Sequence, residues 1–144
     1  MRKPDLPILV VVAGVIEHDG RFLVTRRPPG VHLEGFWEFP GGKCGPEESL
    51  EEGLRREVRE ELDAPVDVGP LILSTRHEYP DRIVELHFYA CRLTGAARPL
   101  LGQEMRWVAR GELTALPFPP ADRELIAQLT GPDAPAPAGR TAAP

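Results

Sequence analysis

The stretch Gly42–Ala64 reads GKCGPEESLEEGLRREVREELDA, and its spacing of apolar and acidic residues predicts one amphipathic helix over residues 47–62. At about 100° per residue, a single apolar stripe follows this helix. Its members are Leu50, Leu54, Val58 and Leu62. Glu57 and Glu61 lie within about 20° of the first residue of the stripe, and Glu60 lies on its flank. These three acids therefore border the buried face of the helix.

The start of this helix is predicted near Glu47. Pro46 would lie near the first helical position, where a missing backbone N–H costs nothing. Glu47 and Glu48 would then lie in the first turn, where acids interact favourably with the helix dipole. Glu51 and Glu52 are expected on the solvated face.

The three acids beside the apolar stripe need a positive partner. Carboxylates three and four residues apart on a helix are neighbours, and their like charges repel one another. Partial burial makes this repulsion more costly unless a cation lies between them. A hard divalent cation that prefers oxygen ligands answers both requirements. The pattern alone thus predicts a metal site at Glu57, Glu60 and Glu61.

Length and composition indicate one globular domain. The chain has 144 residues, 42% hydrophobic and 27% charged, which suffices for one core and is too short for two domains. A net charge of -5 argues against a nucleic-acid polymer as partner, but it allows a small anionic ligand bound through a metal. Cys44 and Cys91 have no metal-site spacing and suit free thiols in a reducing compartment. The apolar run Ile8–Ile16 is too short to span a membrane, so a cytoplasmic protein without a membrane partner is expected.

Strand and helix patterns alternate along the rest of the chain. The expected strands and one short aromatic segment are Ile8–Glu17, Arg21–Arg27, Phe36–Phe39, Val66–His77, Ile83–Leu93 and Met105–Ala109. The first two form a hairpin around an Asp-Gly turn, and a closing helix is predicted over Pro120–Leu129. The pattern favours an α/β layered domain over residues 1–130. Residues 131–144, GPDAPAPAGRTAAP, hold too few large apolar groups to pack and are predicted to be a disordered tail.

The stretch Gly42–Ala64 resembles the Nudix box, which is the signature of the Nudix hydrolase family. Seven of the nine defined positions match at the family's spacing, namely Gly42, Glu48, Arg56, Glu57, Val58, Glu60 and Glu61. Asp63 stands where the family has Gly, and Ala64 stands where it has a larger aliphatic residue. Asp tolerates the left-handed conformation that ends many helices, so the first departure is expected to affect stability more than activity.

Four further motifs resemble the MutT branch of this family. They are VTRR at 24–27, WEFPGGK at 37–43, YPDR at 79–82 and PFPPAD at 117–122, and the resemblance extends to about Leu129. It implies a Nudix-type α/β/α sandwich in which a mixed β-sheet lies between helices. It also implies a pyrophosphohydrolase that cleaves a nucleoside triphosphate to the monophosphate and pyrophosphate.

The resemblance implies that Glu57, Glu60 and Glu61 hold Mg²⁺, or Mn²⁺ in its place, with the carbonyl oxygen of Gly42 as a further ligand. Such a metal ion would bridge the enzyme and the triphosphate and make a water molecule more acidic. Glu57 and Glu60 are counted among the catalytic residues. The general base is either Glu57 or Glu104, a loop acid before the Met105–Ala109 segment.

Substrate contacts are also implied by the resemblance. Arg27 and Arg82 match positions that contact phosphate or sugar, and the guanidinium fork suits that task. Phe39 is expected either to line the base pocket or to belong to the core. Arg56 is expected to pair with Glu48 or a loop carbonyl and not to touch the substrate.

The position of Asp122 bears on the choice of base. Asp122 would either contact the base or cap the closing helix. An ionised carboxylate only accepts hydrogen bonds, so it needs an N–H of guanine or cytosine, or must itself be protonated. The first substrate predicted is 8-oxo-dGTP, and CTP or a modified dCTP is the alternative. A third interpretation is a non-catalytic module that senses a nucleotide; it predicts loss of the metal acids, and all three are present.

Overall fold

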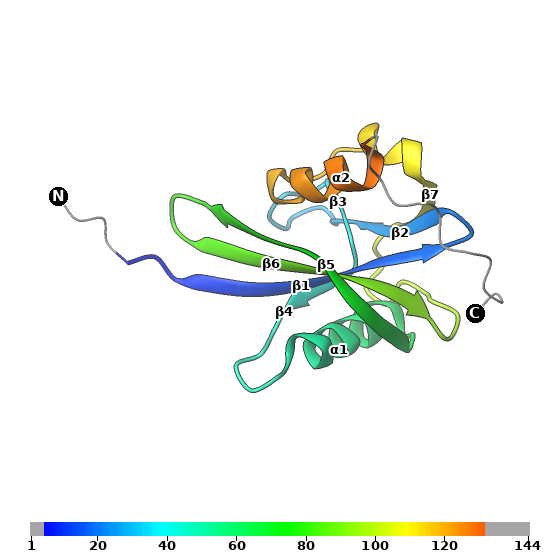
Figure 1. Ribbon diagram of the computed structural model, residues 1–144, viewed down its shortest axis with the longest axis horizontal. Helices are drawn as coiled ribbons and strands as arrows, with labels where there is room; N and C mark the ends of the chain where they lie inside the picture. The colour runs from blue at the N-terminus through cyan, green and yellow to red at the C-terminus, as the bar shows by residue number, and fades with distance from the viewer. Residues whose placement is uncertain (1–4, 132–144) are drawn as a thin grey trace.

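The computed structural model describes residues 5–131, in which seven strands form one mixed sheet with a helix on each face (Figure 1). The strand order is β3-β2-β1-β6-β5, with β4 also paired to β1 and β7 to β2. The strands are β1 Ile8–His18, β2 Arg21–Arg26, β3 Trp37–Glu38, β4 Gly41–Lys43, β5 Val66–Glu78, β6 Ile83–Leu93 and β7 Met105–Ala109. The predicted α/β fold, with a mixed sheet between helices, is confirmed.

Strand β1 joins the two halves of the sheet. It pairs in parallel with β6 and antiparallel with β2 and β4. Its β-branched and apolar composition suits a strand covered on both sides, and residues 12–16 are indeed all buried. Side chains alternate between the faces, so Val12 and Ile16 pack on one side of the sheet and Ala13 and Val15 on the other.

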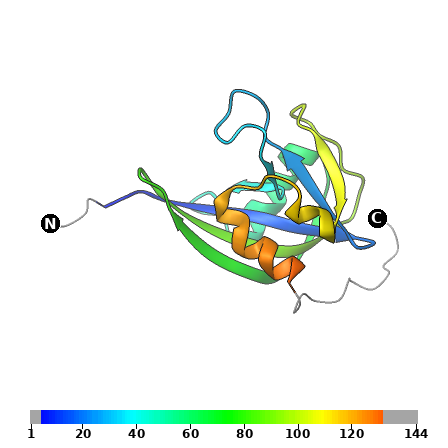
Figure 2. The same cartoon turned by 90° about the horizontal axis from the view of Figure 1, so that it is seen from above.

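Each face of the sheet carries its own core. Helix α1, Leu50–Leu62, packs the predicted apolar stripe, including Leu54 and Val58, against one face. Helix α2, Arg123–Thr130, covers the opposite face through Leu125 and Leu129. Figure 1 shows the sheet between the two helices, and Figure 2 shows α2 lying over the middle of it.

The predicted start of the long helix was wrong by three residues. Helix α1 begins after Ser49, whose Oγ accepts the backbone N–H of Glu52 at 3.1 Å, while the Glu52 carboxylate accepts the N–H of Ser49 at 3.1 Å. This reciprocal capping box satisfies two donors at the helix start. The sequence signal is Ser49 followed three residues later by Glu52. As a result, Pro46, Glu47 and Glu48 lie in the loop before the helix.

The end of α1 has the predicted left-handed residue. Asp63 has φ 52° and ψ 38°, and its N–H donates to the carbonyl oxygen of Arg59 at 3.0 Å. Its carboxylate also pairs with Arg98 at 2.8 Å. Asp63 thus closes the helix in the place where the family has Gly.

Helix α2 also starts later than predicted. Two short 3-10 helices, η1 at Arg110–Thr114 and η2 at Pro120–Asp122, precede it. Within the described part of the chain, no helix is long and apolar enough to cross a membrane. From residue 132 onward, the predicted tail lies outside the residues that the structure describes.

Candidate functional site

A pocket of about 530 Å³ opens where β1, β4, the acidic side of α1 and the turn between β5 and β6 meet. Eight of the nine site residues predicted from the sequence line it. They are Arg27, Phe39, Gly42, Glu57, Glu60, Glu61, Arg82 and Asp122. The fold therefore brings together residues from five separate parts of the chain.

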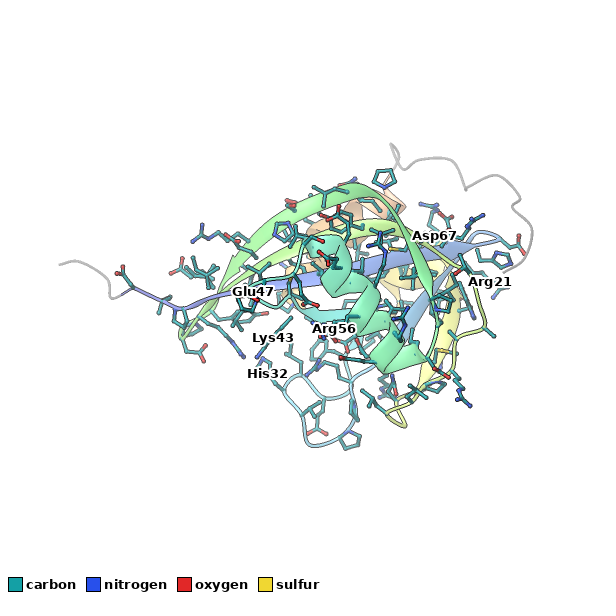
Figure 3. All side chains as sticks on the ribbon, turned by 90° about the horizontal axis from the view of Figure 1, so that it is seen from below. Arg21, His32, Lys43, Glu47, Arg56 and Asp67 are labelled. Carbon is teal, nitrogen blue, oxygen red and sulfur yellow. The ribbon has the colours of Figure 1, made fainter. Side chains whose placement is uncertain are left out.

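Arg56 connects the acids of α1 to the loop before the helix. Its Nε donates to Glu48 Oε2 at 2.6 Å, and its Nη2 donates to Glu48 Oε1 at 2.9 Å and to the carbonyl oxygen of Lys43 at 3.0 Å. Figure 3 shows Arg56 and Lys43 close together beside α1. These hydrogen bonds from Arg56, with one from the Gly45 N–H, lower the pKa of Glu48 to about 2. Arg56 was expected to pair with Glu48 or a loop carbonyl, and it pairs with both.

The same guanidinium reaches two of the predicted metal ligands. Its Nη1 donates to Glu57 Oε1 at 3.1 Å and to Glu60 Oε2 at 3.2 Å. Burial raises the pKa of Glu57, and Arg56 opposes this rise. A Cβ at Gly42 would lie 2.5 Å from the carboxylate of Glu57, so only glycine lets this acid lie directly against the β4 backbone.

The ionised form of Glu61 is poorly stabilised by its surroundings in the pocket. Its Oε1 is buried and has no hydrogen-bond partner among the described residues. Burial, together with the neighbouring charges of Glu38 and Glu57, raises its pKa to about 8. A buried acceptor without a partner and two acids beside it make a site that favours added positive charge.

The chemistry of Glu57, Glu60 and Glu61 fits a divalent cation, although their carboxylates do not converge on one point. Across residues 5–131, no three His, Cys, Asp or Glu side chains already surround a common point as a metal site. Two predicted ligands, Glu57 and Glu60, are held by Arg56 instead. The orphaned oxygen of Glu61 and the oxygen-only donor set nevertheless suit a hard cation such as Mg²⁺.

Glu38 also lines the pocket, and sequence reasoning missed it. Its Oε2 accepts a hydrogen bond from Arg27 Nη1 at 3.1 Å, and Arg27 Nε donates to the carbonyl oxygen of His32 at 2.5 Å. Burial raises the pKa of Glu38, while Arg27 lowers it. Glu38 acts electrostatically on both Glu61 and Asp122. The available signal was an acid placed between Trp37 and Phe39 in a strand-like segment.

Asp122 faces the pocket and does not cap α2. Its side chain is 6% exposed and makes no capping hydrogen bond, so the capping interpretation was wrong. Burial, with a smaller effect from the charge of Glu38, raises its pKa to about 7. Sequence reasoning did not single out Tyr79, whose pKa is raised by burial and also by the charge of Asp122.

Two further predicted residues border this part of the pocket. Arg82 Nε is buried without a hydrogen-bond partner in the described chain, and its guanidinium lies 5.9 Å from the ring centre of Tyr79. Phe39 is 4% exposed and stacks on Phe118 at 5.4 Å while lining the pocket. Phe39 therefore belongs both to the core and to the pocket wall.

Glu104 is the one predicted site residue that the fold does not bring to this pocket. It lines a separate hollow of about 370 Å³ between the loop after β2 and the loop before β7. Its carboxylate accepts hydrogen bonds from Arg26 at 3.4 Å and from Arg106 at 3.1 Å. The structure thus offers no support for Glu104 as general base.

Comparison with known proteins places this arrangement in a family. The NUDIX domain family matches residues 11–128. The CTP pyrophosphohydrolase of Escherichia coli is 36% identical over 122 residues, which cover 84% of this chain and 90% of that protein. The 8-oxo-dGTP diphosphatase of Haemophilus influenzae is 35% identical over 127 residues, which cover 87% of this chain and 93% of that protein.

Solved structures agree with this assignment. The solution structure of the E. coli ORF135 protein superposes with a TM-score of 0.76 at 36% identity, covering 84% of this chain and 87% of that one. The crystal structure of a MutT protein from Methanosarcina mazei Go1 gives a TM-score of 0.77 at 26% identity, covering 86% and 94%. The chain belongs to the NUDIX domain family and is a Nudix hydrolase.

Proposed function

We propose that this Nudix hydrolase is a Mg²⁺-dependent nucleoside triphosphate pyrophosphohydrolase that acts on oxidised or noncanonical (d)NTPs. Its preferred substrate in this proposal is 8-oxo-dGTP. The observation that carries the proposal is a single pocket lined both by Glu57, Glu60 and Glu61 from α1 and by the buried Asp122 from η2. Such a pocket can hold phosphates at the acids through a metal and a base at Asp122. The 35% identity to an 8-oxo-dGTP diphosphatase supports this choice.

In this proposal Glu57, Glu60, Glu61 and the carbonyl oxygen of Gly42 would hold Mg²⁺, and Mn²⁺ could replace it. When bound, the metal ion supplies charge neutralisation for the phosphates and makes water more acidic. Arg56 orients Glu57 through the 3.1 Å hydrogen bond. Glu57 then serves as the general base and takes a proton from the attacking water. The water oxygen bonds to phosphorus as a phosphoanhydride P–O bond breaks, which releases a nucleoside monophosphate and pyrophosphate.

Two arginines would bind the nucleotide beyond the reacting phosphorus. Arg82 has a buried Nε donor without a hydrogen-bond partner in the described residues, since Asp81 Oδ1 lies 3.8 Å away, so an oxygen of the phosphate or sugar can accept from it. Arg27 is already oriented by Glu38 and by the His32 carbonyl. A guanidinium held in this way loses little conformational freedom when it binds an anion.

Asp122 would contact the base in the proposed complex. Its pKa of about 7 means that both protonation states are populated near neutral pH. The ionised carboxylate can accept two hydrogen bonds, which suits the N1–H and N2–H donors of an oxidised guanine. The amino group of cytosine offers a donor as well. Hydrolysis of CTP or a modified dCTP is therefore the second candidate, supported by 36% identity to a CTP pyrophosphohydrolase.

Steady-state kinetics on a substrate panel test the proposal. With Mg²⁺, we expect pyrophosphate release from 8-oxo-dGTP with a kcat/KM about tenfold or more above that for dGTP, CTP and ADP-ribose, which corresponds to ~1.4 kcal/mol of discrimination. A higher kcat/KM for CTP would favour the second candidate. Absence of turnover for every nucleotide would favour a sensing module over an enzyme.

Substitution of Asp122 tests its role in choosing the base. Asp122→Asn adds an amide donor to the acceptor and should change the ratio of 8-oxo-dGTP to CTP activity by about tenfold or more. Glu124→Gln, which changes an exposed acid in the first turn of α2, is the matched control and should leave the ratio unchanged. An unchanged ratio in Asp122→Asn would remove this residue from base recognition.

A further inference from the structure

Gln103 is a buried polar side chain for which the proposed chemistry has no role. It is 7% exposed, and in the described chain it shares burial among polar residues only with Thr25 and Asp122. Its Nε2 donates to the carbonyl oxygen of Glu61 at 3.1 Å, and its Oε1 accepts from the N–H of Leu101 at 2.9 Å. One amide therefore joins the last turn of α1 to the loop before β7.

The loop that carries Gln103 makes two more hydrogen bonds to the same helix end. The N–H of Leu100 donates to the carbonyl oxygen of Glu61 at 2.9 Å, and the N–H of Arg98 donates to that of Leu62 at 2.8 Å. Carbonyl groups in the last turn of a helix have no partner within the helix. The loop supplies these partners.

Leu101 lies on the wall of the main pocket. It lines the pocket together with the acids of α1, although 66% of it is exposed. Gly102 follows with φ +71°, a left-handed conformation that turns the chain back toward Gln103. Contact with a bound ligand would remove the apolar surface of such a rim residue from water, which is favourable.

We propose that Gln103 is a positioning residue. It fixes the backbone of Glu61 relative to the part of the pocket wall that Leu101 forms, here called the Leu101 wall. The proposal rests on the proposed function, because it assigns Glu61 to the metal and Leu101 to the substrate. A primary amide suits this place, since it offers one donor and one acceptor without a charge. The two hydrogen bonds then have separate consequences. The donor side of Gln103 acts on Glu61 and the cation, and the acceptor side acts on the Leu101 wall.

Gln103→Glu and Gln103→Leu separate the two hydrogen bonds. Glu has the same shape and keeps the acceptor for the Leu101 N–H, but an ionised carboxylate cannot donate to the Glu61 carbonyl. Leu removes both. Gln128→Leu, an exposed position on α2, is the matched control. Leu101→Ala removes the wall while it leaves Gln103 and Glu61 in place.

Mn²⁺ binding and amide hydrogen exchange of the protein without nucleotide give readouts that do not depend on turnover. We expect Gln103→Glu and Gln103→Leu each to weaken Mn²⁺ binding about 10- to 100-fold. Exchange of the Leu101 amide should stay slow in Gln103→Glu and become fast in Gln103→Leu. Gln128→Leu should match the wild type in both. With 8-oxo-dGTP, Leu101→Ala should raise KM and keep kcat within about twofold. The contact that is lost binds the substrate and the transition state equally.

The outcome for Gln103→Glu decides the proposal even if Gln103→Leu fails to fold. Wild-type Mn²⁺ affinity in Gln103→Glu would overturn the role of the amide donor. Fast Leu101 exchange in that variant, or a wild-type KM in Leu101→Ala, would overturn the role assigned to the wall. If the wild type hydrolyses no nucleotide, the proposed function fails, but the exchange and Mn²⁺ comparisons still decide whether Gln103 positions Glu61 and Leu101.

Discussion

Arg56 donates to both carboxylate oxygens of Glu48, at 2.6 and 2.9 Å, from a position eight residues further along the chain. This fork-to-fork pair closes the loop before α1 onto the helix. The remaining nitrogen of the guanidinium reaches Glu57 at 3.1 Å. A single cation therefore sets the position of the acid to which we assign the general-base role.

Replacing Arg56 by Lys should reduce activity sharply. A Lys ammonium is a point charge and cannot bind two carboxylate oxygens, a loop carbonyl and Glu57 at once. We expect Arg56→Lys to lower kcat about 10- to 100-fold, with a smaller change in KM. Steady-state kinetics with 8-oxo-dGTP measure this. Arg55→Lys, at the exposed neighbouring position, is the control, and equal activity of the two variants would show that the fork geometry is not needed.

Substitutions at Asp63 should affect folding stability and not turnover. A residue without a short polar side chain pays roughly 1–2 kcal/mol in the left-handed conformation that Asp63 adopts. Asp63→Leu should therefore lower the free energy of unfolding by about that amount. Asp63→Gly should stay within ~1 kcal/mol of the wild type, because relief of strain is offset by a more flexible unfolded chain and a lost exposed ion pair. Urea unfolding measures both, and Asp63→Leu as stable as the wild type would contradict the explanation.

Glu61→Gln should stabilise the metal-free protein at high pH and impair the enzyme. Above its pKa of about 8, Glu61 is ionised beside two other acids with one oxygen unpaired, and that charge destabilises the fold. At pH 9 in EDTA, the variant should gain about 4 °C or more in Tm, which corresponds to ~1 kcal/mol for a domain of this size. At pH 6 the wild-type Glu61 is protonated, so the gain should shrink. An equal gain at both pH values would contradict the electrostatic cause, and undiminished kcat with Mg²⁺ would contradict the metal role.

Asp122 should make the stability of the metal-free protein fall as the pH rises. Its pKa is 3.8 when unfolded and about 7 when folded, so the folded state binds more protons between these values. The contribution is favourable at low pH and is lost as the pH rises through 7, by at most ~4 kcal/mol. Denaturant unfolding at several pH values in EDTA should show a shallower decline for Asp122→Asn. The same slope in both proteins would indicate that Asp122 is not buried as an acid.

Local sequence patterns located the long strands and both helices, but not β4 or η1, and the resemblance to the Nudix box supplied the Arg56–Glu48 pairing. The apolar stripe of α1, the left-handed Asp63 and the Arg56–Glu48 pair all depend on residues close in sequence. The error at Glu47 arose because the acid-rich run masked the capping box that begins at Ser49.

Contacts between distant segments could not be predicted in the same way. Glu38 acts on Glu61 and Asp122 only because β3, α1 and η2 meet at one pocket. Gln103 reaches Glu61 across 42 positions of sequence, and no local pattern marks such a bond. Glu104 looked equally well placed in the sequence, but Arg26 and Arg106 hold it in a different hollow.

Product analysis with 8-oxo-dGTP tests the central claim most directly. We predict that the wild type, in Mg²⁺, releases 8-oxo-dGMP and pyrophosphate, that EDTA abolishes this reaction, and that Glu57→Gln lowers kcat about 10²- to 10⁴-fold. Release of orthophosphate in place of pyrophosphate, or turnover by Glu57→Gln equal to that of the wild type, would contradict the account.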